Sequence, residues 1–111
     1  MIVNTNEGKT VGEVRKRFNE LYPFLRIEFY QNSDFGRVIR KEKLDDGFCL
    51  AGGGMIDISG QRSVTDVKND FLVATKLIAF VYRKSGNVWI ETSHTDSWLL
   101  EQQNFEGEEM D

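Results

Sequence analysis

The chain has 111 residues and a formal net charge of −4, with 40% hydrophobic and 29% charged residues. This length suits one globular domain and is too short for two ordinary ones. The single cysteine, Cys49, excludes an internal disulfide and a paired-cysteine zinc site, and its apolar neighbours predict a buried thiol. No apolar stretch approaches the roughly 20 residues that span a membrane, and the N-terminus lacks a signal-peptide pattern. We therefore expect a cytoplasmic protein.

The first predicted unit runs strand, helix, strand over residues 2–31. Thr10 and Glu13 have the spacing of a capping box, in which a hydroxyl and an acid satisfy the first backbone N–H groups of a helix. Pro23 ends the helix, because the residue before a proline avoids the α conformation. Apolar residues recur between cap and proline at helical spacing: Val11, Val14, Phe18 and Leu21. The alternating run 24–31 then predicts a strand with one apolar and one wet face.

A linker follows over residues 32–53. A structureless connection of this length is unusual in a compact domain. We expect a short strand near residues 36–41 and a single helical turn near residues 48–51. The glycine run at 52–54 precedes a strand, whereas phosphate loops open a helix, so it indicates a flexible linker.

The second predicted unit, residues 55–84, repeats the order of the first. Ser63 and Asp66 form its capping box, 53 positions after Thr10 and Glu13. Three identities support an alignment of 2–31 with 55–84: Val11/Val64, Val14/Val67 and Phe18/Phe71. The pattern fits either a duplicated segment or two generic units that share similar caps.

Two such units in one small domain predict an α+β fold. The specific expectation is a ferredoxin-like sandwich, in which a mainly antiparallel sheet carries both helices on one face. A hairpin strand that turns at 85–87 and a short helix over 96–104, capped by Asp96 or Ser97, complete a single domain of residues 1–104. The last segment, 105–111, is rich in acids and has no base, so it predicts a flexible acidic tail.

The strand over 77–83 is apolar on both faces. Such a strand needs cover on each side, since monomers rarely expose large apolar patches. We expect the segment 98–100, Trp-Leu-Leu, to cover the second face. Without that cover, the face is a surface for a second copy of the chain or for another protein.

The C-terminal segment VYRKSGNVWIETSHTDSWLLEQQN, residues 81–104, resembles the end of a group of small uncharacterised bacterial proteins, which close on a phrase like RKSGN-W-ET--TD-W-L--QN. The resemblance is clear over 54–104, thinner over the first half, and absent across 37–53. It implies a bacterial protein that is complete in this chain. It implies no activity, cofactor or partner.

Few residues are candidates for catalysis or metal binding. His94, the only histidine, lies between Ser93 and Asp96, but neighbours in a strand-to-helix turn diverge, so we expect no catalytic triad. The acids that could hold Mg²⁺ or Ca²⁺ lack the spacing of an EF-hand loop, so no metal site is expected: Asp45, Asp46 and Asp57.

Two basic clusters, at 15–17 and 37–43, are interrupted or flanked by acids in a chain whose pI is about 5.0. Nucleic-acid binding is therefore disfavoured. Lys9 and Arg62 lie in the loops that open the helices, where some regulatory modules of ferredoxin-like fold bind anions; this is an analogy of fold alone.

The residues favour a non-enzymatic protein-interaction or binding module that needs no cofactor, with a second copy or another protein as partner. The alternative is a small ligand-sensing domain or a small enzyme with an unrecognised pocket. A closed polar cavity with a perturbed titratable group would favour the alternative. A large apolar face or an open strand edge would favour the interaction module.

Overall fold

The chain forms both helices and antiparallel strands, which confirms the predicted α+β class. The computed structural model describes residues 1–32 and 38–110, apart from the side chains of residues 32–42. The elements in chain order are β1 (Ile2–Asn4), α1 (Val11–Leu21), β2 (Leu25–Asn32), β3 (Val38–Lys43), β4 (Met55–Asp57), α2 (Val64–Thr75), β5 (Ile78–Ser85), β6 (Val88–Glu91), the 3₁₀ turn η1 (Ser93–Thr95) and α3 (Leu100–Glu109).

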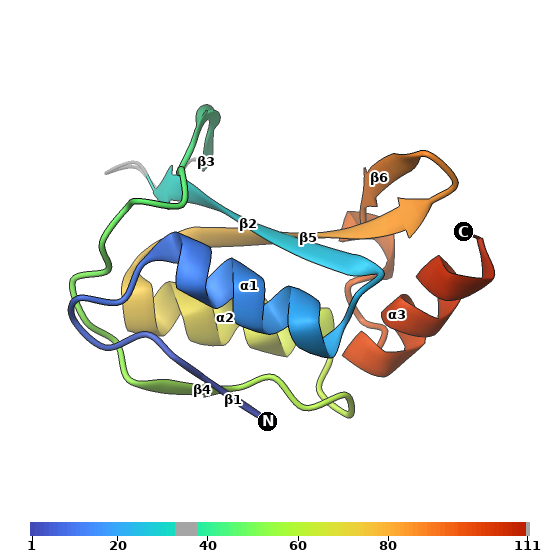
Figure 1. Ribbon diagram of the computed structural model, residues 1–111, viewed down its shortest axis with the longest axis horizontal. Helices are drawn as coiled ribbons and strands as arrows, with labels where there is room; N and C mark the ends of the chain where they lie inside the picture. Colours follow the sequence, from blue (N-terminus) through green and yellow to red (C-terminus); the bar gives the residue numbers. More distant parts are fainter. Residues whose placement is uncertain (33–37, 111) are drawn as a thin grey trace.

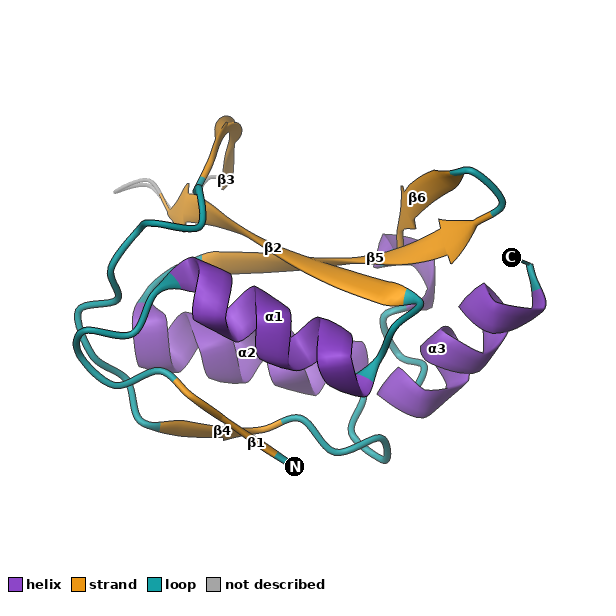
Figure 2. Ribbon diagram, in the orientation of Figure 1, coloured by secondary structure: helices purple, strands orange, loops and turns teal. Residues whose placement is uncertain are grey.

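The strands form two antiparallel sheets, with α1 and α2 between them (Figures 1 and 2). Strands β1 and β4 pair alone, with Val3 opposite Ile56, and the other four follow the order β3-β2-β5-β6. A ferredoxin-like sandwich would unite the strands of both units in one sheet, so that part of the prediction is wrong. Strand β1 has three residues and buries only Val3, which suits a cover over the helices better than the centre of a sheet.

The predicted helix starts are confirmed at both caps. Thr10 Oγ1 accepts from the Glu13 N–H at 3.2 Å, and Ser63 Oγ accepts from the Asp66 N–H at 3.1 Å. The Glu13 carboxylate lies 3.7 Å from Lys9 Nζ. Helix α1 ends at Leu21, as the following proline predicts. The hydroxyl half of each box is therefore in place.

Strands β2 and β5 form the centre of the larger sheet, and their side chains point alternately to its two faces. Ile27 faces Val81 on the side of α1 and α2, and both are buried in the main core. Glu28 faces Phe80 on the opposite side. The residues of β2, β5 and β6 on this opposite side, here called the far face, are Arg26, Glu28, Tyr30, Ile78, Phe80, Tyr82, Lys84, Trp89 and Glu91.

Helix α3 differs from the prediction at both ends. It begins at Leu100, where Gln102 Oε1 accepts from the Leu99 N–H at 2.9 Å, and it continues to Glu109. Residues 105–109 are therefore helical, and the predicted flexible tail from residue 105 is wrong. The end is held by long-range bonds: Asn104 Oδ1 accepts from the Phe24 N–H at 3.0 Å, and the Met110 carbonyl accepts from the Gly86 N–H at 3.0 Å.

The C-terminal segment does not cover the far face. Leu100 is fully buried in the core that α1 and α2 share with the sheet. Arg83, which lies opposite Leu25 on the helix side, donates to Gln103 Oε1 at 2.8 Å. Helix α3 thus packs on the same side as the other helices (Figure 1). The expectation that residues 98–100 cover the second face is wrong.

The linker is ordered where the structure describes it. Strand β3 overlaps the predicted strand at 38–41, whereas residues 36 and 37 lie outside the described part. The predicted helical turn at 48–51 is wrong, because Cys49 pairs with Thr10 as an isolated bridge in extended chain. The hairpin between β5 and β6 turns at Gly86 and Asn87, as predicted.

Candidate functional site

A buried carboxylate lies in the middle of the far face. The Glu28 side chain is 5% exposed, and its Oε1 accepts from Arg15 Nη2 at 2.7 Å and lies 3.5 Å from Arg26 Nη2. Lys43 Nζ lies 3.6 Å from Oε2. Oε2 itself is buried and has no hydrogen-bond partner among the described residues. Three cations thus surround one carboxylate, which leaves positive charge in excess.

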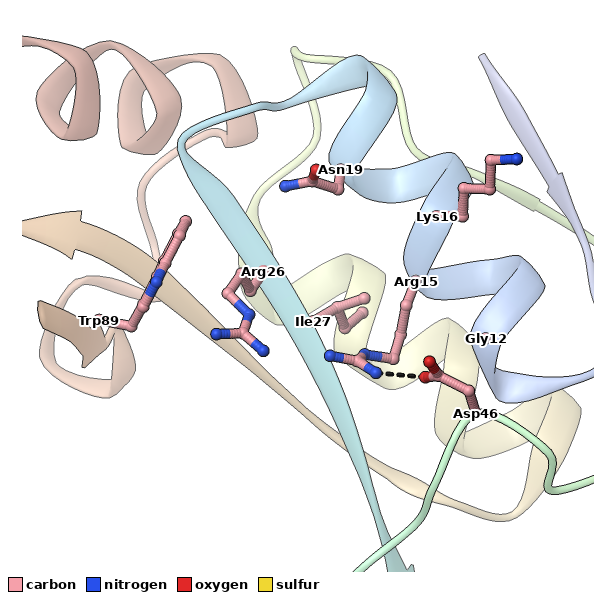
Figure 3. Close-up of a pocket in the computed structure, with 8 residues that line it drawn as sticks. All are labelled: Gly12, Arg15, Lys16, Asn19, Arg26, Ile27, Asp46 and Trp89. Carbon is pink, nitrogen blue, oxygen red and sulfur yellow. Dashed lines mark hydrogen bonds and ion pairs between the residues drawn. The ribbon is translucent and has the colours of Figure 1, made fainter.

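Arg15 reaches this carboxylate from helix α1, around the edge of β2. Its other terminal nitrogen pairs with Asp46, in the turn that follows β3 (Figure 3). Asp46 is largely exposed, with 69% of its side chain accessible. A single guanidinium therefore joins α1, β2 and the turn, and an arginine suits this role because its planar group donates in several directions.

Aromatic side chains cover the rest of the far face. The hydroxyls of Tyr30 and Tyr82 lie 2.8 Å apart, and the Tyr30 ring meets Phe80 edge-on with centroids 5.4 Å apart. Tyr30 is 6% and Phe80 7% exposed. The Arg26 guanidinium lies over the Trp89 ring, 5.3 Å from its centroid. Among these aromatics, Trp89 and Tyr82 are only half-buried.

Two clefts meet at Arg26 and Trp89. The smaller, of about 240 Å³, lies on the far face, and its lining consists of Arg26, Glu28, Tyr30, Lys43, Tyr82 and Trp89. The larger, of about 390 Å³, continues around the edge of β2 onto α1 and is here called the Arg26 cleft (Figure 3). Its lining consists of Gly12, Arg15, Lys16, Asn19, Arg26, Ile27, Asp46 and Trp89.

The Arg26 cleft is basic although the chain is acidic. Its lining holds three cations and one carboxylate, whereas the chain carries a net charge of −4. Asn19 adds an amide at the rim, whose Nδ2 donates to the Leu25 carbonyl at 3.0 Å. A third cleft, of about 520 Å³, lies on α3, and its lining is acidic and aromatic: Trp98, Glu101, Gln102, Phe105 and Glu106.

The residues around His94 do not converge. His94 is exposed in η1, and the Ser93 hydroxyl pairs with Glu91. Asp96 turns the other way, where Oδ1 accepts from Thr92 and Oδ2 accepts from Lys68 Nζ, both at 2.8 Å. These partners hold the turn between β6 and α3.

The three acids that the sequence singled out also have local partners. Asp45 accepts from the Gly47 N–H at 3.1 Å, Asp46 pairs with Arg15, and Asp57 accepts from the Ser59 N–H at 2.9 Å. The bond from Ser59 lowers the pKa of Asp57. In the described part of the chain, no group of three or more His, Cys, Asp or Glu residues could hold a metal ion.

Cys49 is exposed, so the predicted burial is wrong. The cause is the alternation of an extended segment: Leu50 is buried and Phe48 packs against the core, so the residue between them points outward.

The candidate anion loops have other roles. Arg62 pairs with Asp70, which raises the pKa of Arg62, and it donates to the Asp57 carbonyl at 3.0 Å. Lys9 faces Glu13. In the glycine run, Gly53 has a φ of +153°, and a Cβ there would lie 2.5 Å from Thr5 Oγ1, so this glycine is a packing requirement.

Sequence reasoning did not identify the Arg26 cleft. The alternation of β2 correctly placed Arg26 and Glu28 on the face opposite Ile27, which is the one available signal, but Glu28 is buried there and not wet as predicted. The convergence of Arg15, Lys43 and Asp46 on that face depends on long-range packing that no local pattern contains.

No helix among residues 1–32 and 38–110 is both long and apolar enough to cross a membrane. Comparison of the chain with protein-family models, with curated proteins and with solved structures found no match.

Proposed function

We propose that the chain is a non-enzymatic protein-interaction module that binds an acidic segment of a partner in the Arg26 cleft. The observation that carries the proposal is the concentration of Arg15, Lys16 and Arg26 around one cleft of a chain with net charge −4. Complementary charge steers a partner to its site and selects against wrong partners. Arginine is well suited to this, because its fork of donors matches the two oxygens of a carboxylate.

The lining of the cleft supports binding over catalysis. It contains no serine, cysteine or histidine that could act as nucleophile or proton carrier. The pKa shifts of Tyr22, Asp57 and Arg62 arise away from the cleft, because none of these three residues lines it.

The far face favours a protein segment over a nucleic-acid strand. Single-stranded nucleic acids bind by stacking bases on exposed aromatic rings. Here Tyr30 and Phe80 are buried, and the Tyr30 hydroxyl is engaged by Tyr82. Trp89 is shielded by Arg26, whose side chain remains 39% exposed and is thus available to a carboxylate.

A direct test uses a fluorescein-labelled peptide of alternating glutamate and glycine, titrated with the chain and followed by fluorescence anisotropy. We expect binding that weakens as salt rises from 50 to 300 mM, since the attraction is electrostatic. Arg26→Glu should weaken binding at least tenfold. The matched control is Arg17→Glu, which makes the same change of charge at an exposed residue of α1 outside the cleft. It should have little effect on binding.

Three results would contradict the proposal. Equal losses in the two variants would show a response to net charge alone. Equal binding of a lysine–glycine peptide would remove the charge argument. Tighter binding of a thymidine oligonucleotide, lost in Arg26→Glu, would assign the cleft to nucleic acid.

A further inference from the structure

The two halves of the molecule start their helices in the same way. In each half, the first two N–H groups of the helix donate to carbonyls of a turn that lies later in the chain. A leucine N–H of that turn donates in return to a carbonyl just before the helix. The first-half bonds are Val11 to Phe48 (3.0 Å), Gly12 to Asp46 (3.0 Å) and Leu50 to Lys9 (2.7 Å). The second-half bonds are Val64 to Trp98 (3.1 Å), Thr65 to Asp96 (3.0 Å) and Leu100 to Arg62 (2.9 Å).

The turns that accept these bonds also match in sequence. Residues 46–50 read Asp-Gly-Phe-Cys-Leu, and residues 96–100 read Asp-Ser-Trp-Leu-Leu, so acid, small residue, aromatic residue and final leucine coincide. The aspartate of each turn pairs with a cation of its helix: Asp46 with Arg15, and Asp96 with Lys68 at 2.8 Å. Arg15 and Lys68 are 53 positions apart, as are the two caps.

The central strands match as well, at an offset of 52 positions, one less than in the helices. Arg15 reaches over β2 to Glu28, and Lys68 Nζ lies 4.7 Å from the centroid of Phe80, the residue opposite Glu28. The Phe29 carbonyl accepts from the Leu44 N–H at 2.9 Å, as the Val81 carbonyl accepts from the Thr92 N–H at 3.0 Å. Tyr30 and Tyr82, two residues beyond Glu28 and Phe80, meet through their hydroxyls.

We infer that residues 2–50 and 55–100 are pseudo-symmetric repeats, related by a two-fold axis at the Glu28–Phe80 pair, and that the polar residues that bind the ligand belong to the first repeat, with Trp89 of the second repeat completing the wall of the cleft. This assignment rests on the proposed function, and the second repeat serves as an internal control. Contacts that both repeats make, such as the caps and the cation–aspartate pairs, serve the fold. At some matched positions only the first repeat has a polar residue. The fold does not need such a residue, so it can bind the ligand.

Among the residues that line the two clefts at Arg26, three matched positions differ in this way. Asn19 corresponds to Leu72, Arg26 to Ile78 and Glu28 to Phe80. At each one the second repeat carries an apolar side chain, so the fold accepts an apolar residue in that backbone environment. The charges of Arg26 and Glu28 are therefore not required by the architecture. Asn19 and Arg26 line the Arg26 cleft, where the acidic segment is expected, and Glu28 lines the smaller cleft beside it.

The test transplants residues from the second repeat into the first, in the full chain. Arg26→Ile installs the residue that the matched position already holds, and we expect a denaturation midpoint close to that of the wild type with at least a tenfold loss of binding to the glutamate–glycine peptide. Lys68→Met removes the cation of the second repeat that matches Arg15, and it should leave the affinity unchanged. Arg26→Gln serves as a second variant if Arg26→Ile does not fold.

The two proposals fail in different ways. A wild-type chain that does not bind the peptide overturns the proposed function. If the wild-type chain binds the peptide, unchanged affinity in the folded Arg26 variants overturns only the assignment of the binding residues to the first repeat. An equal loss of affinity in Lys68→Met would overturn the same assignment. Chemical-shift changes on peptide addition give an independent readout: we expect them at the amides of residues 19 and 26, and shifts as large at residues 72 and 78 would contradict the inference.

Discussion

At the scale of single residues, Tyr22 links the end of α1 to the segment after β4. Its hydroxyl donates to the Ile58 carbonyl at 2.6 Å, and the residue is buried. Burial, together with the charges of Glu101 and Asp57, raises its pKa to about 12. A tyrosine in an unfolded chain titrates near pH 10. The folded state therefore holds the proton more tightly, and this contribution to stability is complete below about pH 10 and lost as the pH rises toward 12.

The prediction is that Tyr22→Phe lowers the free energy of unfolding at pH 7 by about 1 kcal/mol, because the Ile58 carbonyl loses its donor. The difference in stability between wild type and variant should then shrink as the pH rises from 10 to 12. Urea denaturation at several pH values measures it, and the subtraction removes the effect of other groups that titrate in this range. A difference that stays constant over this range would contradict the assignment.

Residue environments followed from the sequence only where neighbours along the chain decide them. The alternation of β2 correctly separated Ile27 from Arg26. The burial of Glu28 could not be predicted in this way, since it depends on Arg15, thirteen positions away on a different element. The prediction for Cys49 was wrong for the opposite reason. Its apolar neighbours indicated a buried position, whereas the extended backbone turns alternate side chains outward.

At the scale of elements, the caps of α1 and α2 give the next prediction. Thr10→Ala and Ser63→Ala should each lower the free energy of unfolding by about 1 kcal/mol, since each removes the acceptor of a first-turn N–H. Ser97→Ala, at an exposed turn residue, is the control and should change little. Denaturant midpoints unchanged in both cap variants would refute the role of the hydroxyls.

Gly107 decides how closely α3 approaches β2. A Cβ at this position would lie 2.8 Å from Phe24 Cβ and 2.9 Å from the Phe24 carbonyl oxygen. In an isolated helix, alanine would be favoured over glycine by about 1 kcal/mol. We predict the opposite sign here, a loss of about 1–3 kcal/mol, because the extra methyl group overpacks the contact. Gly47→Ala, whose Cβ would meet nothing closer than 3.6 Å, is the control, and thermal denaturation that shows Gly107→Ala to be stabilised would contradict this packing.

Elements with local signals were predictable, whereas the two ends of α3 were not. Helices α1 and α2 each have a hydroxyl cap and an apolar stripe, and both starts were placed correctly. Helix α3 has Leu99 at its N-cap, with the bond supplied by Gln102, and its last turns are acidic. Its order comes from bonds to residues 24 and 86, which a reading of local composition cannot reveal.

At the scale of the whole molecule, the sequence predicted the class and the sides of the strands but not their partners. Pairing between strands is non-local, and three-residue strands such as β1 and β4 carry too short a pattern to specify a partner. The same apolar residue, Val3, would be buried in a ferredoxin-like sheet or in a separate cover over the helices. The layered arrangement in Figure 2 therefore does not follow from local sequence patterns.

The layers should also differ in stability. Strands β1 and β4 form a two-stranded sheet, a unit that is marginal by itself, and the apolar residues that it contributes to the core are Val3 and Ile56, with Ile58 directly after β4. Strands β2 and β5 pair over six facing positions in the middle of the larger sheet. We predict that the small sheet opens locally at a lower free energy than the central strands.

Native-state hydrogen exchange at low denaturant tests this order. The amides of Thr5 and Ile58, which donate to the carbonyls of Gly54 and Met1, report on the small sheet, whereas those of Glu28 and Phe80 report on the central strands. Tyr22→Phe should lower the opening free energy of the first pair more than that of the second, because Tyr22 anchors Ile58. Equal opening free energies for both pairs in the wild type would mean that the two sheets and the helices unfold as one cooperative unit, and the small sheet would then be an integral wall of the core.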